Sequence, residues 1–283
     1  MKEFKDKVAV ITGAASGIGR GIAERCAQEG MKIVLADIEK EALTKTEEEM
    51  KGKGATVLAV PTDVSKARDV DALAQKTLDA FESVHLLCNN AGVGGGTSIW
   101  ESTLADWEWV IGVNLWGVIH GVRTFVPIML KQDTECHIVN TSSVGGLLSG
   151  PVLGVYKVTK HGVVTLSETL YHELTQQGAK IGVSVLCPGV VRTRIGESER
   201  NRPLALRNPP IERTPTPEEL AFMQRLQERT QNGTPPEQVA DQVFKAIKEE
   251  KFYILTHPEF KESIQLRMED ILQERNPTPP KMF

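Results

Sequence analysis

The chain has 283 residues and a formal net charge of −4, and 40% of its residues are hydrophobic while 25% are charged. Such a composition allows a buried core and argues against a disordered protein. The slightly acidic charge, with no run of basic residues, argues against nucleic acid or an anionic membrane surface as a partner.

Short β-branched runs alternate with longer helical patterns along most of the chain. Strands are expected over residues 8–12, 32–37, 56–60, 85–89, 137–140, 183–186 and 253–256. Helices are expected over residues 18–28, 39–51, 66–81, 104–130 and 155–177. The strands are continuous apolar runs, which is typical of a parallel sheet covered on both faces. We therefore predict an α/β fold: one three-layer αβα domain with a doubly wound, Rossmann-like parallel sheet.

A different pattern begins after Arg192. Residues 194–217 hold clusters of Arg, Asn and Pro and are expected to form a loop. Helix starts follow at Thr216-Pro217 and Thr234-Pro235. We expect the segment from about 194 to 234 to be a helical substrate lid. The apolar residues that would pack either on substrate or on the domain are Leu220, Phe222, Met223 and Leu226.

A C-terminal helix and tail are expected over about residues 258–283 of the single domain. Four apolar residues of the helix have near-helical spacing: Phe260, Ile264, Met268 and Ile271. They either cover the domain or pack on a partner subunit.

The four cysteines, Cys26, Cys88, Cys136 and Cys187, are far apart and form no CxxC pair. We expect buried, unpaired thiols in a reducing compartment. The six histidines show no HExxH spacing, so no metal is expected in the chemistry. No signal-length apolar stretch begins the chain, and we expect a cytoplasmic protein without a membrane anchor.

A glycine-rich turn, residues 12–19, joins the first strand to the first helix. Glycines allow a tight turn and let the backbone approach a pyrophosphate at the helix N-terminus. Any tight strand–helix turn could use glycines, but the placement in a βαβ unit favours a dinucleotide. The cofactor-binding residues expected here are Gly13, Ser16, Gly17, Ile18 and Gly19.

Asp37 ends the second strand, 18 residues after Gly19. An acid at this position binds ribose hydroxyls and repels a 2′-phosphate. Ile38 supplies no cation to attract that phosphate, although Arg20 could soften the repulsion. The pattern favours NAD, with NADP as the alternative; Asp37 could also simply cap the next helix.

Tyr156 and Lys160 are four residues apart in a helical stretch and share one face. A nearby ammonium, like an oxidised nicotinamide, favours the phenolate and lowers the pKa of a tyrosine. Such a tyrosine can give a proton to a carbonyl oxygen or take one from an alcohol. Ser143, at the end of a strand, could hydrogen-bond the reacting oxygen. Taken singly, these residues could equally be a surface tyrosine on a lysine stem and a turn serine.

These residues occur with Asn89-Asn90-Ala91-Gly92, Asn114 and Pro188-Gly189. In this order and spacing, from about residue 7 to 257, the set resembles the short-chain dehydrogenase/reductase family in its single-domain form. The resemblance implies a hydride transfer between a nicotinamide cofactor and a ketone or secondary alcohol.

The resemblance also implies roles for the matched residues. Tyr156 is the general acid/base, Lys160 tunes its pKa and binds the nicotinamide ribose, and Ser143 orients the substrate oxygen. Asn114 would hold a water that completes a proton relay, although it could equally satisfy an irregularity in a helix. The remaining implied cofactor contacts are Asp63 and Val64 at the adenine, Asn90, Ala91 and Gly92 along the cofactor, and Pro188, Gly189, Val191 and Thr193 near the nicotinamide.

The substrate side is expected to be uncharged. Residues 94–96, 144–148 and 151–154 should frame it and contain no charged side chain, which favours an uncharged, fairly apolar ketone or alcohol. Three arginines of the lid could meet an anionic substrate, or could simply be solvated: Arg202, Arg207 and Arg213.

A homodimer or homotetramer is expected, because members of the family usually associate through the two long helices, here 104–130 and 155–177. The large apolar residues expected to contribute to that interface are Trp109, Trp116 and Phe125. Two other functions use the same fold. The intact Ser143, Tyr156 and Lys160 argue against a non-catalytic dinucleotide-sensing regulator. A sugar-nucleotide epimerase or dehydratase usually has a larger C-terminal substrate domain than this sequence contains.

Overall fold

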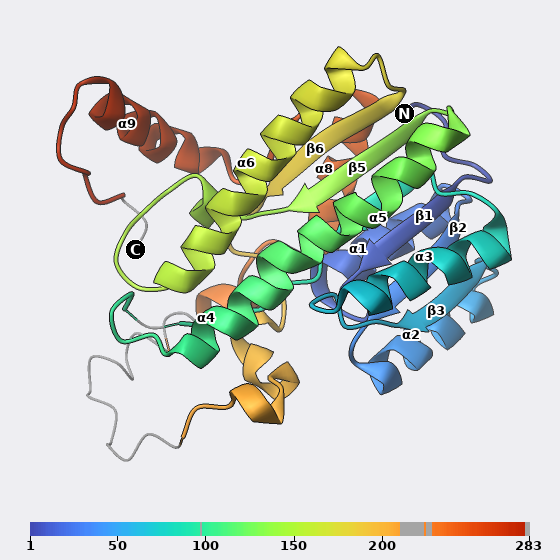
Figure 1. Cartoon of the computed structure of the whole chain (residues 1–283), viewed down its shortest axis with the longest axis horizontal. Coiled ribbons are helices and arrows are strands. Elements are labelled where there is room, and N and C mark those ends of the chain that lie inside the picture. Colours follow the sequence, from blue (N-terminus) through green and yellow to red (C-terminus); the bar gives the residue numbers. More distant parts are fainter. Residues whose placement is uncertain (97, 210–223, 225–227, 281–283) are drawn as a thin grey trace.

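A seven-stranded parallel sheet forms the centre of the protein, as Figure 1 shows. The computed structural model describes residues 1–96, 98–209, 224 and 228–280. The strands lie in the order β3-β2-β1-β4-β5-β6-β7 and all pairs are parallel. Their bounds are β1 Val8–Thr12, β2 Lys32–Asp37, β3 Val57–Pro61, β4 Leu86–Asn89, β5 Cys136–Thr141, β6 Ile181–Cys187 and β7 Tyr253–Leu255. The expected doubly wound parallel sheet is confirmed.

Helices cover both faces of the sheet (Figure 1). One layer contains α1 (Gly17–Gln28), α2 (Lys40–Gly52) and α8 (Pro236–Lys248), whose apolar sides share one core cluster with Ile11, Leu35 and Leu186. The other layer contains α3 (Ala67–Phe81), α5 (Gly117–Gln132) and α6 (Gly154–Gln176), packed on a second cluster. The strand side chains are buried in both clusters, which explains their unbroken apolar runs.

The stretch expected as one helix from 104 to 130 is interrupted by a turn of π-helix. α4 (Leu104–Ile111) starts with a capping box between Thr103 and Asp106, the π-helix covers Gly112–Trp116, and α5 follows directly. Together, Leu104–Gln132 is long and apolar enough to cross a membrane by length and composition alone, because an 18-residue stretch within it has a mean hydropathy of 1.3. The core contacts of α5 are those of a helix packed on a sheet.

Two of the three large aromatic residues that were expected to form a subunit interface are buried within this chain. Trp109 and Phe125 are buried in this chain's own core, so the expectation that they supply subunit-interface area is wrong. The hydrophobicity of a residue does not distinguish burial in the core of its own chain from burial against a partner subunit. Trp116 is 49% exposed and stacks on His120. All four cysteines are buried and free, as expected.

The region after β6 contains short 3₁₀ turns where a loop was expected, at Ile195–Asn201 and Leu204–Leu206. We refer to residues 194–209 as the crossing segment. The expected helix start at Thr216-Pro217, the four apolar lid residues after it and Arg213 lie outside the described residues. The expected start at Thr234-Pro235 is confirmed, because α8 begins at Pro236.

The C-terminal helix α9 (Lys261–Leu272) extends away from the sheet in Figure 1. Of the four apolar residues expected on one face, Phe260 and Ile264 are half-buried, whereas Met268 and Ile271 are exposed, so only the start of this helix packs on the domain. The chain after α9 turns back, and the Thr278 amide donates to Asp270 at 2.8 Å.

Candidate active site

Four loops meet at the carboxyl ends of the central strands, where ligands of open α/β sheets bind. They follow β1, β4, β5 and β6. Asn90 fastens the first two, because its side-chain amide donates to the Thr12 carbonyl at 3.0 Å and its backbone N–H donates to Thr12 Oγ1 at 2.9 Å. Ala91 N–H reaches the same hydroxyl at 3.0 Å, and Thr141 Oγ1 donates to Asn90 Oδ1 at 3.3 Å. Thr12 belongs to the glycine-rich turn expected from the sequence, whereas Thr141 was not singled out there.

The turn between β1 and α1 needs its glycines. Gly13 has a φ of 65°, and a Cβ at Gly19 would overlap the Gly13 carbonyl oxygen. Ser16 is the N-cap residue, but its side chain caps no amide of α1, so first-turn N–H groups are open to a ligand. A Cβ at Gly17 would lie 3.0 Å from Thr193 Cγ2, which places the loop after β6 beside this turn.

Asp37 holds this turn to the start of α2. Its carboxylate accepts from Ala15 N–H at 2.9 Å and from Glu39 N–H at 3.0 Å. Burial raises the pKa of Asp37, while these backbone hydrogen bonds oppose the rise. The helix-capping alternative is thus partly realised, through the Glu39 amide. Arg20 is paired with Glu24 and Glu49, so its charge is already balanced.

The crossing segment reaches the corner occupied by Asp37. Glu39 accepts from Arg200 Nη2 at 2.6 Å and from Asn201 Nδ2 at 2.9 Å, and Arg194 lies 3.9 Å from it. Two arginines therefore pair with Glu39, which follows Asp37 by two residues in the chain. Asp37 is the residue expected to reject a 2′-phosphate. No local pattern predicts this contact, because the partners are more than 150 residues apart in the chain.

Tyr156 and Lys160 lie on the first turns of α6, and Lys160 is only 3% exposed. Lys160 Nζ donates to the Thr141 carbonyl at 3.0 Å and lies 5.5 Å from the centroid of the Tyr156 ring. Burial lowers the pKa of Lys160 to about 8. Burial also raises the pKa of Tyr156, although a hydrogen bond with Ser143 opposes the rise. The expectation that Lys160 lowers the pKa of Tyr156 is therefore wrong for the free protein, because loss of hydration disfavours the phenolate and raises that pKa.

Ser143 joins the catalytic side of the site to the loop after β6. Its Oγ accepts from Gly145 N–H at 3.0 Å and donates to the Pro188 carbonyl at 3.4 Å. The Val144 amide donates to the same carbonyl at 2.9 Å. Ser143 and Pro188 were both expected at the site, and the structure brings them together.

Asn114 lies fully buried in the π-helix. Its Oδ1 accepts from Val93 N–H at 2.8 Å, and its Nδ2 donates to the Val93 carbonyl at 2.9 Å and to Thr159 Oγ1 at 3.3 Å. A Cβ at Gly92 would lie 3.4 Å from Asn114 Oδ1 and 3.5 Å from Lys160 Nζ. The amide thus faces the ammonium across Gly92, and both sequence interpretations of Asn114 are compatible with its contacts.

The loop before Tyr156 is held by Lys157, which the sequence analysis did not single out. Lys157 Nζ donates to the carbonyls of Gly150, Pro151 and Val152 at 2.8, 3.0 and 2.9 Å. Val152 and Leu153 both have a positive φ, of 54° and 55°, which is unfavourable for a β-branched residue such as valine. Three ammonium hydrogen bonds help to fix this strained stretch next to the tyrosine.

Arg202 is buried and paired within the chain, so the solvated interpretation of it is wrong. It is 4% exposed and its guanidinium lies 2.7 Å from Asp106 and 4.9 Å from the centre of the Trp109 ring. Ser198, also in the crossing segment, accepts from Gly94 N–H at 2.9 Å. The crossing segment is therefore fastened at Glu39, Gly94 and Asp106. Arg207 is exposed, which fits the solvated interpretation.

The expected adenine pair makes local contacts. Asp63 Oδ1 accepts from the amide and the hydroxyl of Ser65 at 3.0 and 2.7 Å. Val64 is buried against Gly117, and its carbonyl lies 2.9 Å from His120 Nδ1. These contacts fix the loop after β3, at the same sheet edge as the glycine turn.

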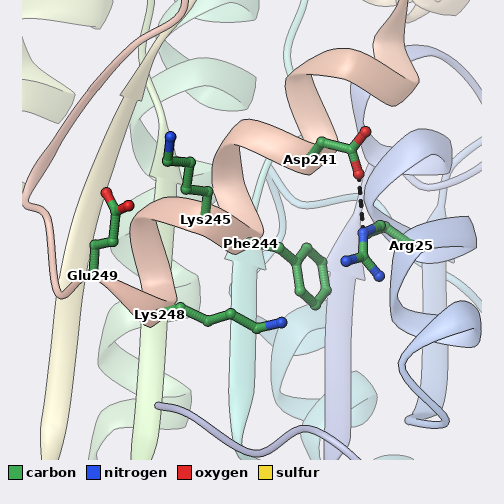
Figure 2. Close-up of a pocket in the computed structure, with 6 residues that line it drawn as sticks. All are labelled: Arg25, Asp241, Phe244, Lys245, Lys248 and Glu249. Carbon is green, nitrogen blue, oxygen red and sulfur yellow. Dashed lines mark hydrogen bonds and ion pairs between the residues drawn. The ribbon is translucent and has the colours of Figure 1, made fainter.

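A separate surface hollow lies between α1 and α8 and contains none of the site residues (Figure 2). Arg25 pairs with Asp241 at 3.0 Å and lies 5.0 Å from the centre of the Phe244 ring. The Arg25–Asp241 pair and the contact of Arg25 with Phe244 join α1 to α8 across this hollow. Among the described residues, no group of His, Cys, Asp and Glu could hold a metal ion.

Comparison with known proteins places this arrangement in a family. The family described as short chain dehydrogenase matches residues 7–203. A short-chain dehydrogenase/reductase from Burkholderia phymatum, solved in complex with NAD, is 52% identical with a TM-score of 0.95, over 100% of both chains. The CLA biosynthesis dehydrogenase/reductase of Lactiplantibacillus plantarum is 38% identical, over 98% of this chain and 97% of the relative. The C alpha-dehydrogenase of Sphingobium sp. strain SYK-6 is 35% identical, over 98% and 89%. The chain therefore belongs to the short-chain dehydrogenase/reductase family and is an oxidoreductase.

Proposed function

We propose that this protein transfers a hydride between a nicotinamide dinucleotide and a ketone or secondary alcohol, with Tyr156 as the general acid/base. The observation that carries the proposal is the gathering of Ser143, Tyr156, Lys160 and Asn114 beside the glycine turn, at one edge of the sheet. A proton donor, a buried ammonium and a hydroxyl at one point are what carbonyl reduction requires.

The residues at the edge of the sheet suit a dinucleotide. Open amides at the start of α1 and the glycine turn can take the pyrophosphate, and the Asp37 carboxylate can take ribose hydroxyls. Residues 188–193 lie beside both the glycine turn and Ser143, which suits contact with the nicotinamide end. When bound, the nicotinamide ring supplies or accepts the hydride.

Tyr156 moves the proton at the substrate oxygen, and Ser143 orients that oxygen through its hydroxyl. Because the pKa of Lys160 is about 8, this side chain carries its charge at neutral pH. The ammonium stabilises the phenolate that forms when Tyr156 gives up its proton, against the opposing effect of burial. Asn114, facing Lys160 across Gly92, is the residue best placed to continue the proton path through a water.

We propose a preference for NAD, on the strength of the Asp37 carboxylate. The NAD complex of the Burkholderia phymatum relative supports this choice. Arg194 and Arg200 do not override it, because both are committed to ion pairs with Glu39 or Glu197. An uncharged substrate is favoured by the lack of charged side chains in residues 144–148 and 151–154. A cytoplasmic homo-oligomer remains part of the proposal, with the exposed Trp116 on its contact face.

The test compares Tyr156→Phe with Tyr171→Phe, which removes an exposed hydroxyl from the same helix. We expect the first variant to lose about 10²–10⁴-fold in kcat while its Kd for NAD stays close to that of wild type. The control should retain full activity. Turnover of a panel of ketones and alcohols, followed at the absorbance of the reduced cofactor, measures kcat. Substantial turnover by Tyr156→Phe would overturn the proposed mechanism.

A further inference from the structure

The loop that follows β6, residues 188–193, has few hydrogen bonds of its own. It is held from the C-terminal part of the chain instead. Thr234 N–H donates to the Val190 carbonyl at 3.0 Å, and Arg192 N–H donates to the Thr234 carbonyl at 3.0 Å. Further contacts from this part of the chain come from His257, which lies just after β7 and to which neither the sequence analysis nor the proposed mechanism gives a role.

The His257 ring contacts the loop through both of its nitrogens. Nδ1 lies 3.1 Å from the Gly189 amide nitrogen, which can only donate. Nε2 lies 3.2 Å from the Val190 carbonyl oxygen, which can only accept, and 3.1 Å from Thr234 Oγ1. These partners fit a ring whose Nδ1 accepts from Gly189 and whose Nε2 carries a proton. Thr256 Oγ1, at 2.7 Å from Nδ1, can donate to the same nitrogen.

The ring also fills the space behind Gly189. A Cβ placed on this glycine would lie 2.7 Å from His257 Cγ and 2.8 Å from Phe260 Cε2. The backbone of the loop thus rests directly on the imidazole. On the side of the loop away from His257, the Pro188 carbonyl accepts hydrogen bonds from Ser143 Oγ and from Val144 N–H. The loop is held between the residue that orients the substrate oxygen and His257.

We propose that His257 is a positioning residue that sets the placement of the nicotinamide-binding loop, an inference that rests on the proposed function. It acts through the Gly189 amide and the Val190 carbonyl and does not itself touch the reacting atoms. Without its hydrogen bonds, the amide and the carbonyl lose a fixed partner, and the loop can shift away from Ser143. The adenosine end of the cofactor, held at Asp37 and the glycine turn, does not depend on this ring.

The experiment separates the two ends of the dinucleotide by comparing the Kd for NAD with that for ADP-ribose, measured by calorimetry. His257→Leu removes both hydrogen bonds at similar volume. We expect it to raise the Kd for NAD about tenfold, the effect of one lost hydrogen bond of about 1.4 kcal/mol, and to leave the Kd for ADP-ribose unchanged. Amide exchange in a peptide containing Gly189 should become faster in the free protein. His172→Leu, on the exposed side of α6, is the matched control and should change none of these values.

Two further variants distinguish a bond from general packing and replace His257→Leu if that protein does not fold. His257→Asn keeps an acceptor near the position of Nδ1, whereas His257→Gln places its amide near Nε2. We expect both to bind NAD more tightly than His257→Leu, and Asn to slow exchange at Gly189 more than Gln.

An equal loss of affinity for NAD and ADP-ribose, or an unchanged Kd for NAD with unchanged exchange at Gly189, would refute the role of His257. If the wild-type protein bound neither compound, the dinucleotide site itself would be wrong, and the inference would fall with it.

Discussion

Replacing Lys160 with methionine should abolish turnover and yet stabilise the free protein. Burial lowers the pKa of Lys160 from 10.5 to about 8, which corresponds to about 3 kcal/mol of unfavourable free energy for the charged form in the folded state. Methionine fills a similar volume without charge. The substitution also removes the hydrogen bond to the Thr141 carbonyl, at a cost of about 1–2 kcal/mol. At pH 7 the variant should therefore be more stable by about 1–2 kcal/mol.

The pH dependence gives the sharper test. Between pH 8 and about 10.5 the unfolded chain keeps a proton that folded Lys160 releases, so the free energy of unfolding of wild type contains a term that rises with pH. The stability of Lys160→Met relative to wild type should fall by about 2–3 kcal/mol between pH 7 and pH 10, so that wild type becomes the more stable protein at the higher pH. Urea denaturation of both proteins without cofactor measures it, and Lys40→Met, at an exposed position of α2, is the control. If the difference in free energy of unfolding between wild type and Lys160→Met did not change with pH, burial of the Lys160 charge would not be its cause.

Two further predictions concern the crossing segment and the ribose corner. Arg202→Met should lower the free energy of unfolding by about 2–3 kcal/mol, because it removes one partner of the buried pair with Asp106. This is less than the usual cost of breaking a buried pair, since Thr103 and Asn208 still donate hydrogen bonds to Asp106. Thermal denaturation measures this, the exposed Arg207→Met should be neutral, and equal melting temperatures for the two variants would count against the buried pair. Asp37→Ala should lower the ratio of kcat/KM for NAD to that for NADP, and it should also weaken NAD binding, because Ala15 and Glu39 lose their acceptor. An unchanged ratio would contradict the ribose assignment.

The sheet and most of its helices could be predicted because the signals are local. A buried parallel strand is a short apolar run, and Val8–Thr12 and Ile181–Cys187 are visible in the sequence for that reason. The glycine turn and the spacing of Tyr156 and Lys160 are local as well. The π-helix at Gly112–Trp116 has no such signal, because Asn114 is held there by Val93, 21 residues earlier in the chain.

Long-range contacts account for what the sequence did not reveal. The burial of Arg202 depends on Asp106 and Trp109, which lie on another element. His257 and Gly189 are 68 residues apart in the sequence, and a single histidine after a strand does not predict a contact with so distant a residue. The raised pKa of Tyr156 could not be predicted either. The spacing to Lys160 can be seen in the sequence, but the burial that raises this pKa depends on the whole fold.

Two neighbouring ion pairs of the crossing segment should respond differently to ionic strength. The Arg200–Glu39 pair is 26% and 22% exposed, whereas Arg202 and Asp106 are 3% and 10% exposed. Exposed pairs contribute about 0–1 kcal/mol and are screened by salt, while buried pairs are screened far less. Raising the salt concentration should therefore detach the segment at the ribose corner first and leave it anchored beside Trp109.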